Sequence, residues 1–426
     1  MSERIPCRTE GCSATILPAT AEKTGGICMP CHQELLRLEQ EAYIRENRKD
    51  IDVYAGITDP VEILRRMHTR RPYNPLERVL PYEKSREEVY ASLSSEDIER
   101  LKAYAAALIE EDELDTAQDI LAALVCWTEA SIADCLPLLM SRQEYHPSIL
   151  YMHATAEIRD ELIRQLDLDA DNCNAILLAL AWVGDEKVVE LFREWRAHPP
   201  EWAKERYIAP EAYAREAGWE LTASGQRRNL YDMDCYPVVT GMPSGEEGEA
   251  ASILGKGEQQ CGWCGSDMTV LFDLHLTHPQ LKGYGLPWNR LRIATCISCT
   301  CYGYIYTDVD AEGQVHWSPW NREPDYWVKP EEESAFGEAA HLFRLSASKR
   351  SAFHAASWTL EASSSQLGGH PTWVQDADYP PCPGCSATMK FIGQLDWEDV
   401  EEYGEGIYYA FICPDCRIAA TNYQQT

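Results

Sequence analysis

The sequence predicts an α+β protein of several domains, with an N-terminal cysteine-rich module, an α-helical block and a C-terminal β-rich region that contains one module twice. Three observations predict this class. Twelve of the 17 cysteines fall into three sets of four, the middle of the chain has apolar residues at helical spacing, and the region after residue 258 is rich in Tyr, Ile, Val and Thr. The expected boundaries are 1–45 for the N-terminal module, 46–90 for a connecting segment, 91–215 for the helical block, and 259–330 and 340–426 for the two β-rich modules.

The cysteine sets point to metal binding. They are Cys7, Cys12, Cys28 and Cys31; Cys261, Cys264, Cys296 and Cys299; and Cys382, Cys385, Cys413 and Cys416. In a chain without a secretion signal, paired cysteines at these spacings are more often metal ligands than disulfides. Four thiolates make the tetrahedral shell of a structural zinc site and leave no open coordination position. We therefore expect three structural zinc ions, the first of them in an N-terminal zinc ribbon over residues 1–45, and no catalytic residue among these ligands.

Alternative roles and ligands for the cysteines remain open. An iron–sulfur cluster also takes four cysteines, whereas redox C-x-x-C motifs act singly on a thioredoxin-like frame that is not evident here. In the first set His32 could replace a ligand, and in the second Cys301 offers a competing thiol. The remaining cysteines are expected to be core or surface thiols; they are Cys126, Cys135, Cys173 and Cys235.

The two C-terminal sets begin with similar segments, "CGWCGSDMTVLFDL" and "CPGCSATMKFIGQL". Aligned on the first cysteine pair, they match outside the cysteines as well. The matched pairs are Met268 and Met389, Val270 and Phe391, Leu271 and Ile392, and Leu274 and Leu395. Zinc knuckles that arose independently would not share these positions, so the pattern indicates an internal duplication. Residues 308–320 are expected to form a hairpin with its turn at Gly313.

Two segments beside these modules are predicted from composition. The Gly- and Glu-rich residues 240–258 are interpreted as a flexible linker, and residues 330–360 as one or two helices. In "SSQLGGHPTWVQDADYPPCPGC", residues 364–385, Gly368 and Gly369 are expected to form a tight turn and Trp373 to fill the core. A ligand-binding role for the two glycines is the alternative.

The helical block is expected from six segments with apolar residues at helical spacing. The first begins with a Ser cap at "SSED", and Gly184-Asp185 is typical of a C-cap glycine followed by an N-cap aspartate. Helices of this length joined by short turns fit a HEAT-like stack of antiparallel pairs. A plain helical bundle is the alternative.

Charge restricts the class of partner. The chain has 38 Lys and Arg against 69 Asp and Glu, a net charge of −31. Residues 1–90 carry a net −1, residues 91–200 a net −14 and residues 201–426 a net −16. Such acidity repels phosphate backbones, so we expect no nucleic-acid binding and a basic protein as the natural partner. A role of the charge in solubility alone is the alternative.

The chain shows no sign of secretion or of membrane insertion. Its N-terminal "MSERIPCRTEGC" lacks the apolar stretch of a signal peptide, and no apolar run approaches the ~18 residues of a membrane span. We therefore expect a cytoplasmic protein that does not associate with a membrane. No P-loop, G-x-G-x-x-G or Ser-His-Asp pattern is evident in the sequence. The oligomeric state is left open.

The C-terminal segment resembles the YwqG-like bacterial family, whose members share a "GG-x-P-x-W-x-Q" segment followed by an "M-x-F-x-x-Q-L" strand. The matching residues are Gly368, Gly369, Pro371, Trp373, Gln375, Met389, Phe391, Gln394 and Leu395. The pattern is also similar to the eukaryotic programmed-cell-death-two family, which assists a ribosomal protein before assembly. In the first copy Asp273 stands where the second has Gln394, so the first copy departs from the pattern.

The resemblance implies a β-rich protein-binding domain without enzymatic activity. Bacterial relatives lie beside secreted toxins and have been proposed as immunity proteins, which neutralise a toxin by binding it. The function expected is therefore that of an immunity protein bound to a basic toxin. Two alternatives stay open, a chaperone for a basic client such as a ribosomal protein, and an enzyme with its site between the duplicated modules.

Overall fold

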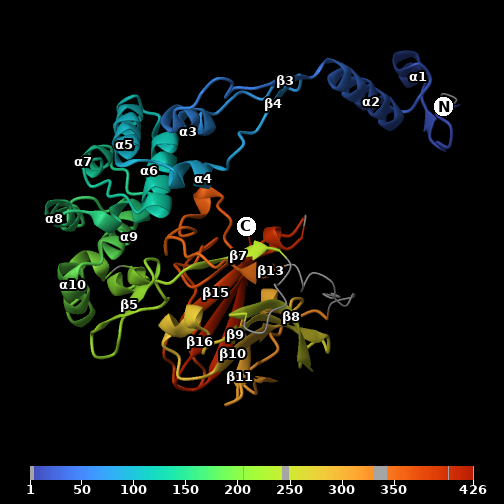
Figure 1. Ribbon diagram of the computed structural model, residues 1–426. Coiled ribbons are helices and arrows are strands. Elements are labelled where there is room, and N and C mark those ends of the chain that lie inside the picture. The colour runs from blue at the N-terminus through green and yellow to red at the C-terminus, as the bar shows by residue number, and fades with distance from the viewer. Residues whose placement is uncertain (1–3, 205, 242–248, 330–342, 402, 426) are drawn as a thin grey trace. The chain divides into compact units, whose positions relative to one another are not determined.

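The chain divides into two compact units, Met1–Arg86 and Glu87–Thr426. The computed structural model describes residues 4–204, 206–241, 249–329, 343–401 and 403–425 (Figure 1). Each unit is described by itself below. Within the described residues, no helix combines the length and the apolar character needed to cross a membrane.

The described part of unit 1, residues 4–86, contains short strands and three helices. In chain order they are β1 (Ile5–Pro6), β2 (Thr15–Ile16), α1 (Pro18–Thr24), α2 (Met29–Asn47), β3 (Lys49–Ile51), α3 (Pro60–His68) and β4 (Glu77–Val79). β1 pairs antiparallel with β2, and β3 pairs parallel with β4. The Asp59 side chain accepts a hydrogen bond from the Val61 amide, and Pro60 occupies the first turn, so α3 starts where its sequence requires.

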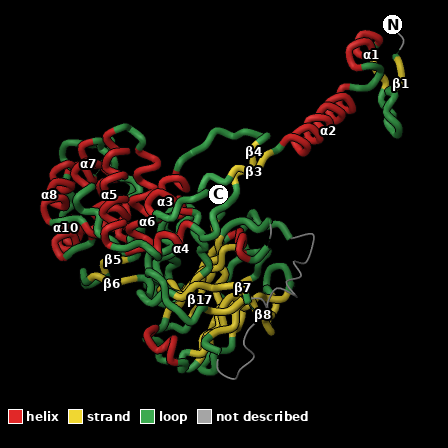
Figure 2. Tube along the Cα trace, turned by 45° about the horizontal axis from the view of Figure 1, so that its top comes forward, coloured by secondary structure: helices red, strands yellow, loops and turns green. Residues whose placement is uncertain are grey.

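Unit 2 begins with the helical block. Its elements are α4 (Arg86–Ala91), α5 (Ser95–Glu110), α6 (Leu114–Thr128), α7 (Leu136–Ser141), the 3-10 helix η1 (Ser148–His153), α8 (Ala156–Gln165), α9 (Cys173–Val183), α10 (Glu186–Ala197), and the 3-10 helices η2 (Glu201–Ala203) and η3 (Pro210–Arg215). Figure 2 shows α5, α6, α7, α8 and α10 grouped together, with the strands β5 and β6 beside α10 and the other labelled strands of the unit gathered elsewhere. Each of the six segments expected to be helical contains one of these helices, which confirms a helical middle region.

The helix ends follow the signals read from the sequence. Ser94 and Asp97 form a reciprocal capping box at the start of α5. Gly184 ends α9 in the left-handed conformation at φ 49°, and the Asp185 side chain accepts from the Val188 amide at 2.9 Å to begin α10. α5 packs on α6 and α8 on α9, so neighbours in sequence are neighbours in space.

The remainder of unit 2 is mainly antiparallel β structure. The strands are β5 (Trp219–Leu221), β6 (Arg227–Asn229), β7 (Tyr236–Thr240), β8 (Ala251–Gln260), β9 (Asp267–His275), β10 (Arg290–Thr295), β11 (Ile305–Val309), β12 (Val315–Trp317), β13 (Phe343–Leu345), β14 (Gln366–Leu367), β15 (Lys390–Asp396), β16 (Ile407–Cys413) and β17 (Ile418–Gln424). One sheet has the order β10-β9-β8, and a larger sheet has the order β12-β11-β17-β16-β15-β14-β7-β13. β5 and β6 form a separate hairpin.

The larger sheet is covered on both faces. On one face Ile392 and Ile412 join a core with Phe272 and Ile293 of the three-stranded sheet. On the other face Phe391 packs in a second core that also contains Trp373 and Tyr409. Because every residue of β16 is buried, this strand has no polar face, as expected for a strand covered on both sides.

The hairpin β9–β10 has the same register as the hairpin β15–β16. Each of the six residue pairs of the first hairpin has an equivalent pair in the second, with a constant offset of 121 residues from β9 to β15 and of 117 residues from β10 to β16. For example, the pair Asp273 and Arg292 corresponds to the pair Gln394 and Tyr409. Both hairpins also carry a β-bulge at the matching position, where Leu271 in β9 and Ile392 in β15 are skipped by the facing strand.

The strand before each hairpin, β8 in the first copy and β14 in the second, also pairs at equivalent positions. Ser252 pairs with Asp273 as Gln366 pairs with Gln394, and the next residue of each strand pairs correspondingly. Beyond these pairs the chain takes a positive φ in both copies, 55° at Leu254 and 69° at Gly368. The module is therefore repeated from β8 onward, earlier than the expected start at residue 259.

The fourth strand breaks the correspondence. β17 pairs with β16 of its own module, whereas β11 is hydrogen-bonded to β12 and to β17 of the other module. The two modules therefore share the pairing of three strands and differ in the pairing of the fourth. The hairpin expected over residues 308–320 is present as β11 and β12, with Gly313 at φ 79° in the turn.

Two expectations from composition are corrected. Residues 251–258, interpreted as part of a flexible linker, belong to strand β8, and residues 242–248 lie outside the described residues. Of residues 330–360, expected to be helical, 330–342 also lie outside the described residues. The rest contains strand β13 and the single-turn 3-10 helix η7 (Trp358–Leu360). Pairing of β13 with β7 explains the strand, because residues 343–345 extend the sheet.

Candidate functional site

The structure brings together each of the three predicted cysteine sets. In every set the four Sγ atoms lie within 4.8 Å of one another. One cluster belongs to unit 1, and its members are Cys7, Cys12, Cys28 and Cys31. The two clusters of unit 2 are Cys261, Cys264, Cys296 and Cys299, and Cys382, Cys385, Cys413 and Cys416.

The sulfur spacing suits a tetrahedral metal ion. One Sγ–Sγ distance is 3.8 Å in the first cluster, 3.5 Å in the second and 3.7 Å in the third. Zn–S bonds of ~2.3 Å place the corners of a tetrahedron about 3.8 Å apart, whereas a disulfide holds its sulfurs at ~2.05 Å. Hydrogen bonding with Cys385 raises the pKa of Cys416 to about 11, so this thiol stays protonated near neutral pH unless a cation lies beside it. The clusters therefore fit metal ions, and a shell of four thiolates favours zinc.

The first cysteine pair of each cluster in unit 2, Cys261–Cys264 and Cys382–Cys385, has a similar backbone conformation. The amide of Cys261 donates to the Ser266 carbonyl and that of Cys382 to the Ala387 carbonyl, both at 2.8 Å. The turn residue before each acceptor has a positive φ, 87° at Gly265 and 62° at Ser386. In each cluster this turn places the Sγ atoms of the first two cysteines on the same side of the chain, where both can bind one ion.

The alternative ligands lie outside the clusters. His32 is absent from the first group of ligands, and its amide donates to the Cys28 carbonyl at 2.8 Å. Cys301 is exposed, and its thiol lies 3.6 Å from the Ser298 carbonyl. The four cysteines expected to be ordinary thiols are all buried. Burial raises the pKa of one of them, Cys126, to about 12, which keeps it in the unreactive thiol form.

The Gly-Gly pair of the C-terminal motif makes close backbone contacts. Gly368 and Gly369 have φ values of 69° and 70°. A Cβ at Gly368 would lie 2.0 Å from the Asp234 carbonyl oxygen, and one at Gly369 would lie 2.9 Å from the Ala352 carbonyl oxygen. Both glycines are needed where two backbones approach, which agrees with their expected role in a turn.

Buried amide side chains hold the rest of that motif. The Gln394 Oε1 accepts from the Thr372 amide at 2.9 Å, and its Nε2 donates to the Ser364 carbonyl at 2.8 Å. Gln366 Nε2 donates to the His370 carbonyl at 2.9 Å. Trp373 is buried and stacks on Tyr409 at 4.8 Å between ring centroids. These residues therefore position the chain and leave few polar atoms for a ligand.

A cleft of about 600 Å³ opens within unit 2 beside the same motif. Its walls come from η1, α9, η3 and the segments 356–359 and 370–377. The lining combines large aromatic side chains with a few charged groups. The aromatic residues are Trp182, Tyr213, Trp358 and Trp373, and the acidic and basic residues other than histidine are Arg215, Glu216 and Asp376. This size is typical of ligand sites in proteins.

Glu216 and His370 both have strongly shifted pKa values in the cleft. The Glu216 Oε1 accepts from the Ala377 amide at 2.6 Å, but burial still raises the pKa of Glu216 to about 7. His370 lies beside it, with Nε2 2.9 Å from the Glu216 carbonyl oxygen and Nδ1 2.8 Å from the Pro371 carbonyl oxygen. A neutral imidazole can donate to only one of these, and burial lowers the pKa of His370 to about 4.

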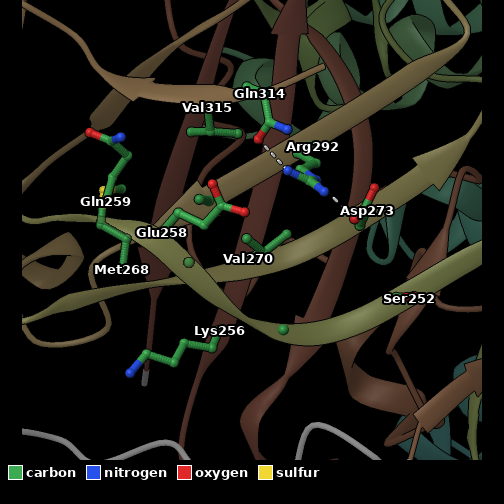
Figure 3. A pocket seen from close by; sticks show the side chains of 13 residues that line it. Ser252, Lys256, Glu258, Gln259, Met268, Val270, Asp273, Arg292, Gln314 and Val315 are labelled. Carbon is green, nitrogen blue, oxygen red and sulfur yellow. Dashed lines mark hydrogen bonds and ion pairs between the residues drawn. The ribbon is translucent and has the colours of Figure 1, made fainter. Parts of the chain in front are cut away.

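A smaller hollow of about 110 Å³ lies along β8, β9, β10 and β12 (Figure 3). Figure 3 shows Arg292 reaching between Asp273 and Gln314. Asp273 accepts 2.7 and 2.6 Å bonds from Arg290 as well, and these pairs lower the pKa of Asp273 although burial alone would raise it. The charges of the hollow are thus largely satisfied within the chain.

The sequence alone did not reveal either hollow. Of the residues in the larger cleft, those that lie in the segment 364–385 singled out by the sequence are His370, Trp373, Gln375, Asp376 and Ala377. Glu216 lies in a stretch without any recognisable pattern, and nothing but its acidic character marked it. The walls come from segments up to 231 positions apart, from 146 to 377.

A comparison with known proteins adds one relative of the whole chain. The uncharacterized protein YpfL of Salmonella typhimurium strain LT2 is 40% identical over 431 residues, covering 100% of both chains. The chain belongs to the YpfL family. No family model matches it, and no solved structure matches it either. Membership of the YpfL family thus extends across both units but brings no activity with it, because that relative is itself uncharacterized.

Proposed function

We propose that the protein is a non-enzymatic, zinc-stabilised immunity protein that neutralises a basic toxin by binding it directly in the cytoplasm. The observation that carries the proposal is the charge of unit 2. This unit has 24 Lys and Arg against 56 Asp and Glu, a net charge of −32, whereas unit 1 has 14 against 13, a net charge of +1. Such a field speeds encounter with a cationic partner.

Three further points support this proposal. The resemblance of residues 364–416 to the YwqG-like family implies protein binding, and the repeated register of β8–β10 and β14–β16 favours duplication of one such module. Four thiolates fill the coordination shell of zinc, so the metal is assigned a structural role. Reduced thiols of this kind persist in the cytoplasm.

The test is co-expression of the protein with the toxin encoded at its own locus. The protein is expected to protect cells from that toxin and from no unrelated one, and to co-purify with it. The association rate should fall on the order of tenfold between ~0.05 and ~0.5 M salt, since steering is screened while buried contacts are not. Protection without a complex would overturn the binding mechanism.

Purification of the protein with its bound partners also tests the two alternative functions, a chaperone and an enzyme. A chaperone would co-purify with a ribosomal protein and keep it soluble. An enzyme is favoured by one observation, a buried carboxyl with a raised pKa in a cleft, which is where acid–base residues are found. This cleft lies against the helical block, not between the two zinc modules where an enzymatic site was expected. Reversal of a toxin's modification by the purified protein would establish the enzyme.

A further inference from the structure

The larger cleft of unit 2 has the composition of a site for a cationic side chain. Trp358 is 56% exposed at its wall, and Ile208, another lining residue, is 52% exposed. Buried aromatic rings from Trp182 and Tyr213 complete the lining. These exposed apolar side chains give the rim of the cleft a surface on which the apolar part of a bound side chain can pack.

The charges of the cleft complement a cation. Glu216 and Asp376 supply two carboxylates against the single guanidinium of Arg215, so the ionised cleft has a net charge of −1. Glu216 Oε1 is occupied by the Ala377 amide, whereas its second oxygen accepts no hydrogen bond from a donor among the described residues. Arg215 is exposed and offers donors to the backbone carbonyls of a bound segment.

We propose that this cleft receives an arginine side chain carried by an extended segment of the basic partner protein. The inference rests on the proposed function, because it names the feature of that partner which the cleft recognises. Arginine is preferred to lysine because its guanidinium is planar, less strongly hydrated and stacks on aromatic rings while pairing with a carboxylate. The volume of about 600 Å³ leaves room for the neighbouring backbone.

Binding of a cation should be linked to ionisation of Glu216. A bound guanidinium favours the carboxylate, so affinity should rise with pH through the range around 7. The other charged or titratable groups that line the cleft are Arg215, Asp376, His146, His370 and Tyr213, and Tyr379 is also coupled electrostatically to Glu216. His370 stays neutral above about pH 4, and burial raises the pKa of Tyr213, so neither accounts for a transition near 7.

The test uses the zinc-loaded, full-length protein and a capped Gly-Gly-Arg-Gly-Gly peptide, with titration calorimetry at pH 6, 7 and 8. If only the ionised cleft binds, affinity should increase about tenfold from pH 6 to pH 8. A peptide with neutral citrulline in place of arginine should bind much more weakly, and one with lysine should lie between them. Equal binding of the arginine and citrulline peptides would overturn the proposal.

Two variants identify the residues responsible. Glu216→Gln keeps an acceptor for the Ala377 amide, and it should bind more weakly than the parent does at pH 6, with no dependence on pH across the range. Its control is Glu190→Gln, at an exposed position on α10, which should behave like the parent protein. Trp358→Ala should weaken binding about two- to fivefold, whereas Tyr403→Ala, 88% exposed elsewhere, should not.

The outcomes separate this inference from the proposed function. If a toxin binds Glu216→Gln and Trp358→Ala as tightly as the parent protein, the cleft inference fails and the immunity function stands. If the arginine peptide binds as described but no toxin does, the function fails and the cleft remains a cation site. Chemical conversion of the peptide, seen by mass spectrometry, would overturn docking in favour of catalysis.

Discussion

Leu271 in β9 and Ile392 in β15 are equivalent residues, each skipped by the facing strand at the β-bulge of its own hairpin. Both side chains are fully buried and lie in the same core. A bulge must be placed by the surrounding structure, since it removes a ladder position and bends the strand. Its recurrence at one alignment position supports a common origin of the two modules more strongly than the shared cysteines do.

We predict three zinc ions per chain, because three complete four-cysteine clusters are present. Cys382→Ser should reduce the content to two and destabilise unit 2 by several kcal/mol, since metal binding is coupled to folding in such modules. Elemental analysis and thermal unfolding measure both effects. Cys301→Ser is the control and should retain three ions, because that thiol lies outside the clusters. Protein purified without chelators and found free of zinc would contradict the assignment.

Gly368→Ala should be strongly destabilising, by roughly 3 kcal/mol or more, because its Cβ would lie 2.0 Å from the Asp234 carbonyl oxygen. Gly285→Ala is the matched control, since Gly285 has a similar φ of 62° but nothing within 4 Å of its would-be Cβ. That change should cost about 1 kcal/mol from the left-handed backbone alone. Denaturant unfolding measures the difference, and equal losses in the two variants would refute the steric argument.

Two buried threonines in neighbouring strands should respond oppositely to valine. Thr421 in β17 donates to the Thr295 hydroxyl at 2.7 Å, so Thr421→Val should lower the free energy of unfolding by about 1–2 kcal/mol. Thr307 in β11 is also buried, but its hydroxyl has no hydrogen-bond partner among the described residues. Thr307→Val should therefore be neutral or stabilising by up to about 1 kcal/mol. Equal effects in chemical denaturation would show that the hydroxyl bonding differs from this description.

Stability should depend on pH through Glu216. Burial raises the pKa of this carboxyl from 4.5 to about 7 in the folded protein. The folded state therefore holds the proton more tightly, and its contribution to stability is complete below pH 4.5 and is lost as pH rises through about 7. Glu216→Gln cannot ionise, so the variant does not lose this stability as the pH rises. The free energy of unfolding of the variant minus that of the parent should therefore increase by on the order of 2–3 kcal/mol between pH 4 and pH 8.

Denaturant titrations of both proteins at several pH values measure this dependence. A constant difference between parent and variant across the range would mean that Glu216 ionises normally in the folded state. The exposed position Glu190 again provides a control, because Glu190→Gln should leave the pH profile of stability unchanged.

The sequence predicted the features that rest on local chemistry. Cysteine spacing identified all twelve clustered ligands, and the caps at Ser94 and Asp185 marked helix starts that the structure contains. Strand β8 was missed because its glycines are typical of a linker. A Cβ at Gly257 would lie 2.5 Å from the Met268 carbonyl oxygen, so that glycine is required by the close approach of β9, which only the folded structure supplies.

The larger cleft could not be predicted for a different reason. Its carboxyl, Glu216, and its aromatic residues Trp182 and Trp358 come from distant parts of the chain. No local spacing links them, and the raised pKa of Glu216 arises from burial that depends on packing of the helical block against the C-terminal region. Tertiary structure alone brings these groups to one place.

Strand β17 occupies an interior position of the larger sheet, between β11 and β16. Its residues, Ile418–Gln424, follow the other described strands of unit 2 in the sequence, so the strand that joins β11 to β16 is made after both of them. Until β17 docks, β11 and β16 present unpaired edges, which are open to pairing with other chains. Partly folded copies are therefore exposed to mispairing, and a chain truncated before Ile418 would leave both edges uncovered.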